Sequence, residues 1–85
     1  MVSLRGELDA SNVEEVRSLV DAVAGERPEK LVFDVEALTF IDSAGIAVLI
    51  GAASTAGSVH LRGASPIVRR VIELSGLTEV LRLLP

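Results

Sequence analysis

The spacing of apolar and polar residues predicts four strands in this chain. Apolar residues alternate with polar ones over residues 1–5, where Gly6 should end the strand, and again over residues 58–62. The run from 31 to 36 is almost continuously apolar and rich in β-branched residues, which is typical of a buried strand. A last short strand is predicted at residues 80–84.

Three helical patterns separate these strands. Ser11 and Glu14 fit a capping box, in which the two side chains satisfy each other's free backbone N–H groups. Gly25 is suited to end that helix, and Ser65 followed by proline is suited to begin the third. The predicted helices lie at 12–24, 43–54 and 66–75.

The resulting order, β-α-β-α-β-α-β, predicts a single α/β domain with a largely parallel or mixed four-stranded sheet. Strands that alternate with short helices favour right-handed crossovers in such a sheet. A ligand or partner then binds beyond the carboxyl ends of the strands. The loops at that edge carry Asp9, Asp42, Ser43 and Ser65.

The stretch 40–50 changes abruptly from a strand pattern to a helix pattern, and we interpret it as the working site. Asp42 and Ser43 stand at the helix start, and both residue types cap helix N-termini. The outward side of this helix is small and nearly uncharged, so another protein surface could approach it closely. Its residues are Ala44, Ala47, Gly51 and Thr55.

Composition narrows the class of protein. The chain has 85 residues and no cysteine, so one aliphatic core must stabilise it without disulfides. Its net charge is −4, with no basic cluster beyond Arg69 and Arg70, which argues against nucleic-acid binding. The first residues lack the basic segment, apolar core and small-residue cleavage site of a signal peptide, and no apolar run is long enough to span a bilayer. We expect a cytoplasmic protein without direct membrane insertion.

The reactive side chains and motifs of the sequence also argue against an enzyme. His60, the single histidine, has no clustered partners, and the chain has neither a thiol nor a phosphate loop ending in Lys-Ser/Thr. We therefore expect no metal, no cofactor and no catalytic residue, and a chain that receives a phosphoryl group more readily than it transfers one.

Four segments together resemble the anti-sigma-factor-antagonist branch of the STAS domain family. In that branch the serine after the aspartate is phosphorylated by a partner kinase that is itself an anti-sigma factor. By position, this resemblance implies that Ser43 is the phosphorylated residue. The similar segments are 6–9, 31–46 with its Phe40-Ile41-Asp42-Ser43-Ala44-Gly45 core, 64–70, and 74–77.

The chain departs from the family pattern in two ways. Members usually have another strand before Val2 and a further helix after Pro85, and both are missing from residues 1–85. Their loss would expose a sheet edge and apolar surface, which favours a homodimer. Ala44 stands where a hydroxyl residue is frequent, which leaves Ser43 as the sole acceptor in the motif.

The physics of a serine at a helix start also supports a switch. A phosphoserine carries about −1.5 to −2 charges. Free N–H groups at the helix N-terminus would stabilise it by roughly 0.3–2 kcal/mol and offset repulsion from Asp42. The fold should survive the modification, whereas a partner covering Ser43 would have to desolvate a dianion and should be released.

Each candidate residue also has a purely structural alternative. Ser43 and Asp42 could serve only as helix caps, and Asp9 could be a turn residue that the family resemblance alone promotes to a kinase-facing position. Asp34 lies inside an apolar run, and we expect it to hold an internal hydrogen bond, with Ser65 as a second supporting residue. The predicted partner-binding residues are Asp9, Asp42, Ser43, Ala44, Gly45, Ala47 and Gly51.

The favoured function is that of an anti-sigma-factor antagonist. Unphosphorylated, it would bind an anti-sigma factor with serine kinase activity and free a sigma factor; a serine phosphatase would reset it. One alternative is a STAS accessory subunit of a membrane lipid-transport ATPase, which would bind its partner whatever the state of the serine. Another is a module that senses a small ligand or nucleotide.

Overall fold

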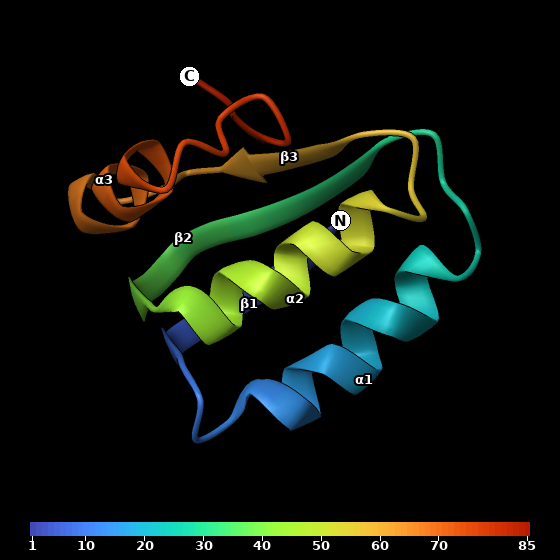
Figure 1. Ribbon diagram of the computed structural model, residues 1–85, viewed down its shortest axis with the longest axis horizontal. Helices are drawn as coiled ribbons and strands as arrows, with labels where there is room; N and C mark the ends of the chain where they lie inside the picture. Colours follow the sequence, from blue (N-terminus) through green and yellow to red (C-terminus); the bar gives the residue numbers. More distant parts are fainter.

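A four-stranded parallel sheet forms the centre of the molecule. The computed structural model describes all residues, 1–85, and its strands follow one another across the sheet in chain order (Figure 1). The predicted element order is confirmed, and every strand pair is parallel. The strands are β1 (Val2–Leu8), β2 (Leu31–Ile41), β3 (Val59–Arg62) and β4 (Leu81–Leu83).

Three helices connect the strands. They are α1 (Val13–Ala24), α2 (Ser43–Ala53) and α3 (Pro66–Leu74). The helices α1 and α2 lie side by side, and α2 packs across the sheet (Figure 1). Because β3 ends well before β2, α3 lies beside the carboxyl-terminal half of β2, beyond the end of β3. None of the three has both the length and the apolar character needed to cross a lipid bilayer.

Aliphatic side chains fill the space between the sheet and the helices. Nineteen buried apolar residues form one cluster, and no polar or charged residue is buried with them. Phe33, in the middle of β2, is the cluster's single aromatic side chain. Such a core is held mainly by the hydrophobic effect, which contributes about 25 cal/mol per Å² of apolar surface removed from water.

The first two strands are longer than the sequence pattern indicates. The prediction that Gly6 ends the first strand is wrong, because β1 passes through Gly6, which adopts a positive φ of 77°. The second strand does not stop at residue 36 but continues to Ile41. Two register shifts between β1 and β2 interrupt the alternation of buried and exposed side chains beyond Val35. The next buried residues in β2 are Leu38 and Ile41, each three positions after the one before.

The starts of α1 and α3 show one wrong and one confirmed cap. The predicted capping box of Ser11 and Glu14 does not form: α1 begins after Asn12 without a side-chain cap, and the Ser11 hydroxyl donates to Asp9 instead. By contrast, Ser65 accepts a hydrogen bond from the backbone N–H of Val68 at 3.3 Å and caps α3 as predicted.

Candidate functional site

The start of α2 is organised by the Asp42 carboxylate. Asp42 has an extended backbone, with φ −114° and ψ −172°, and is the N-cap residue. Its Oδ1 accepts hydrogen bonds from the backbone N–H groups of Ala44 at 2.9 Å and Gly45 at 3.1 Å. A charged acceptor at this position also interacts favourably with the positive end of the helix dipole. Asp42 is therefore the cap that makes an abrupt strand-to-helix turn stable.

Asp42 also joins two loops that are far apart in the sequence. Its Oδ2 accepts a bond from the backbone N–H of Ala10 at 3.4 Å, and its own N–H donates to the carbonyl of Leu8 at 3.2 Å. The β1–α1 loop is thereby held against the start of α2. The carboxyl ends of β1 and β2 meet here, at the edge of the sheet predicted to carry the site.

Asp9 is fixed in that loop by its neighbours. Its carboxylate accepts hydrogen bonds from the hydroxyl and the backbone N–H of Ser11, which together lower the pKa of Asp9 below its usual 3.8. Its backbone N–H donates to Asn12 Oδ1 at 3.0 Å, and the Asn12 amide donates to the carbonyl of Glu7. Asp9 is thus an ionised carboxylate held by hydrogen bonds within its own loop, which Asp42 contacts at Ala10.

Ser43 is exposed at the first position of α2. The capping bonds are made by Asp42, so the alternative in which Ser43 itself caps the helix is wrong. The serine hydroxyl is left available at the surface, between an ordered acidic loop and a helix. This accessibility is what a modifying enzyme requires of its acceptor.

The surroundings of Ser43 carry negative charge and no compensating cation from the same segments. Residues 6–16 and 31–61 contain no lysine or arginine, whereas Asp42 directly precedes the serine and Asp9 lies in the loop that Asp42 contacts at Ala10. Electrostatic complementarity then favours a partner surface with basic side chains. No group of His, Asp and Glu side chains is arranged to hold a metal ion.

Three of the four residues predicted on the outward side of the central helix are exposed. They are Ala47, Gly51 and Thr55, the last lying just beyond the end of α2, whereas Ala44 is half-buried against the core. Gly45 is buried, and a Cβ on it would lie 2.7 Å from Leu8 Cγ. The prediction that Gly45 contacts a partner is therefore corrected: this glycine lets α2 approach the ends of β1 and β2.

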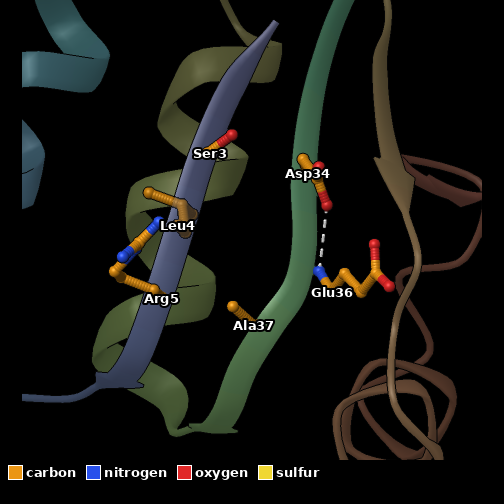
Figure 2. A pocket seen from close by; sticks show the side chains of 6 residues that line it. All are labelled: Ser3, Leu4, Arg5, Asp34, Glu36 and Ala37. Carbon is orange, nitrogen blue, oxygen red and sulfur yellow. Dashed lines mark hydrogen bonds between the residues drawn. The ribbon is translucent and has the colours of Figure 1, made fainter.

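Asp34 and Ser65 lie away from Ser43. Asp34 accepts from the backbone N–H of Glu36 at 3.1 Å and forms an ion pair with Arg62 at 3.1 Å between Oδ2 and Nη1. Its side chain is 22% exposed and the bond to Glu36 is at the surface, so Asp34 holds a local hydrogen bond rather than one inside the core. Figure 2 shows it in a shallow hollow over β1 and β2, on the side of the sheet away from α2. Ser65 is the N-cap residue of α3.

Sequence reasoning gave no role to two residues at the site edge. Asn12 bridges the β1–α1 loop, and its position just before a helix was the available signal. Phe40 is 43% exposed at the end of β2. Continued alternation from the inward-facing Leu31 and Phe33 was the available signal, but the predicted strand ended at residue 36.

Comparisons with known proteins agree with this arrangement. A profile described as STAS domain matches residues 1–85. An anti-sigma F factor antagonist of Lysinibacillus sphaericus is 32% identical over 82 residues, which cover 91% of this chain and 70% of that protein.

Solved structures give the same result. An anti-sigma factor antagonist from Mycobacterium paratuberculosis has a TM-score of 0.86 at 29% identity, over 98% of this chain and 74% of that one. SpoIIAA in its unphosphorylated form has a TM-score of 0.76 at 30% identity, over 98% of this chain and 76% of that one. SpoIIAA in the phosphorylated form has a TM-score of 0.68 at 27% identity, over 98% of this chain and 79% of that one. The chain belongs to the STAS domain family, in the branch of the anti-sigma factor antagonists.

Proposed function

We propose that this protein is an anti-sigma factor antagonist switched by phosphorylation of Ser43. In the unphosphorylated form it binds a cognate anti-sigma factor with serine kinase activity and so frees a sigma factor. Phosphorylation of Ser43 ends that binding, and a serine phosphatase restores it. The observation that carries the proposal is the exposed Ser43 hydroxyl beside a cap made entirely by Asp42.

The names of the relatives supply the partner class. The proteins that match over nearly the whole chain are anti-sigma factor antagonists, and one of them, SpoIIAA, has a structure in the phosphorylated form. Transfer of a phosphoryl group to Ser43 needs a kinase, because this chain has no phosphate-binding loop and no catalytic cluster of its own. The proposal therefore makes the chain a substrate and a binding protein rather than an enzyme.

The geometry of the cap determines how a phosphate at Ser43 would act. The N–H groups of Ala44 and Gly45 are already bound by Asp42, so they are not free to stabilise a phosphoserine as the sequence suggested. A phosphate would add about −1.5 to −2 charges to an edge that already holds two carboxylates. A partner that buried this edge would face a desolvation cost of several kcal/mol unless it supplied cations.

The unphosphorylated edge, in contrast, is suited to close contact. Ala47 and Gly51 are exposed and small, so a partner helix or loop could approach the backbone of α2. Asp9 and Asp42 are held in fixed positions by hydrogen bonds, which lowers the entropy lost when a basic partner binds them. In this role Asp42 is a positioning residue for Ser43 and for the β1–α1 loop.

The test is a pull-down from the native host with the wild-type chain, Ser43→Ala, Ser43→Asp and Thr78→Asp, followed by mass spectrometry. Thr78 is exposed in the turn before β4, at the amino-terminal edge of the sheet, so Thr78→Asp adds the same charge at the opposite edge from Ser43. We expect a kinase-like anti-sigma factor with wild type, Ser43→Ala and Thr78→Asp, and its loss with Ser43→Asp. Circular dichroism should show that Ser43→Asp is folded.

Two results would overturn the proposal. If transporter subunits are retained equally by all four baits, the protein is an accessory subunit of a lipid-transport ATPase and Ser43 is not a switch. If the anti-sigma factor is retained but incubation with it and ATP adds no phosphate to Ser43, the proposed modification is wrong. Intact-mass measurement before and after incubation, with Ser43→Ala as control, decides this second point.

A further inference from the structure

Phe40 is the only aromatic side chain on the surface of this protein. The chain has two phenylalanines and neither tryptophan nor tyrosine. Phe33 is fully buried in the core, whereas Phe40 is 43% exposed. A large apolar ring in water forfeits the hydrophobic gain that its burial would give, so its exposure calls for an explanation.

Phe40 lies on the outward side of β2. Leu31, Phe33 and Val35 face the core, so regular alternation along the strand places residue 40 outside. The first register shift against β1 turns Leu38 inward, and the second, at Thr39, restores the original alternation. Ile41 is therefore buried and Phe40 stays exposed.

Local bonds fix this irregularity. The Thr39 hydroxyl donates to the carbonyl of Gly6 at 3.0 Å, and Gly6 has a φ of 77°, which side chains with a Cβ rarely adopt. These bonds fix the backbone next to Phe40, whose ring stays on the exposed side of β2.

Phe40 lies close to the proposed switch along the chain and in the sheet. It stands two residues before Asp42, and its partner across the strands is Glu7. Asp9 directly follows β1, which ends at Leu8. An exposed aromatic side chain at an edge rich in polar residues is typical of an interface hot spot.

We infer that Phe40 is the anchor by which the anti-sigma factor grips the edge that carries Ser43. The partner must then offer an apolar pocket for the ring, with basic side chains around it that face Glu7, Asp9 and Asp42. The inference rests on the proposed function, because it names the contact made by the same partner. Phe40 gives affinity to the complex, whereas Ser43 switches it.

The experiment measures the affinity of the purified anti-sigma factor, identified in the pull-down, for wild type, Phe40→Ala, Phe40→Leu and Val80→Ala. Val80 is the matched control, because its side chain is 39% exposed and it precedes β4, at the amino-terminal edge of the sheet. We expect at least a ten-fold rise in Kd for Phe40→Ala, a smaller rise for Phe40→Leu, and less than a two-fold change for Val80→Ala. Raising the salt concentration should weaken wild-type binding, since charge pairs at the rim are screened.

The outcomes separate the two proposals. If the wild type binds and Phe40→Ala binds within two-fold of it, the anchor is refuted while the switch at Ser43 stands. If Phe40→Ala loses affinity but melts well below wild type, the Phe40→Leu variant decides. An unchanged melting temperature with several-fold weaker binding of Phe40→Leu supports the anchor. Binding of Phe40→Leu with the affinity of the wild type refutes the anchor. If the wild type does not bind the anti-sigma factor, the proposed function fails and the anchor fails with it.

Discussion

The close approach of α2 to the sheet can be tested at two glycines of the same helix. A Cβ at Gly45 would lie 2.7 Å from Leu8 Cγ, 2.8 Å from Ile41 Cγ1 and 2.9 Å from the Leu8 carbonyl oxygen. One of these contacts is with backbone, which cannot rotate away. At Gly51 a Cβ would meet nothing within 4 Å. Gly45→Ala and Gly51→Ala therefore differ mainly in this contact.

The expected magnitudes follow from that difference. Replacing glycine by alanine inside a helix contributes about 0.5–1 kcal/mol of stability at an open site, so Gly51→Ala should be more stable than wild type. At Gly45 the gain is opposed by overpacking, which costs about 1–3 kcal/mol. The free energy of unfolding of Gly45→Ala should therefore lie about 1–3 kcal/mol below that of Gly51→Ala, because the helix term cancels between them. In a domain of this size that corresponds to roughly 5–20 °C in melting temperature.

Urea denaturation followed by circular dichroism at 222 nm measures both variants. The reasoning is refuted if the two alanine variants unfold within 0.5 kcal/mol of each other, taking ~0.5 kcal/mol as the size of an ordinary surface effect. It is equally refuted if Gly51→Ala is the less stable of the two. A difference in the free energy of unfolding of the expected sign and size would show that Gly45 is required for packing. Loss of binding in a Gly45 variant would then be explained by loss of stability and would not indicate a partner contact.

Two further predictions concern Asp42 and His60. Asp42→Ala should lower the free energy of unfolding by about 0.5–2 kcal/mol, because α2 loses its cap, and Asp42→Asn should recover much of that loss in urea denaturation. An Asp42→Ala protein as stable as wild type would contradict the capping role. Desolvation lowers the pKa of His60 below its ordinary 6.5, and the positive charges of Lys30 and Arg82 lower this pKa further. The Nδ1 atom of His60 is buried without a hydrogen-bond partner. The unfolded chain therefore takes up the proton first, and stability falls as the pH drops below 6.5. The urea midpoint should fall less between pH 7.5 and pH 5.5 for His60→Asn than for the wild type. An equal fall in both proteins would exclude His60 as the cause of this pH dependence.

The sequence by itself determined the elements and their order, because the signals for them are local. Period-two and period-3.6 patterns depend on neighbouring residues, and so do the cap at Ser65 and the helix start at Asp42. Strands that alternate with helices favour a largely parallel sheet, which the structure confirms. The same order gathers the loops that carry the candidate residues at the carboxyl ends of the strands. The motif around Ser43 then pointed to the family, and the profile match confirmed it.

The tertiary structure alone decided how the residues at the site work together. Asp42 reaches Ala10 across 32 positions, and the Thr39 hydroxyl reaches Gly6 across 33, so no local pattern contains these bonds. The competing bond to Asp9 removed Ser11 from its predicted cap. Burial of Gly45 and of Leu38 likewise depends on how β1 lies against β2 and α2. These features come from contacts between segments far apart in the chain, whose relative positions are fixed only when the whole core packs.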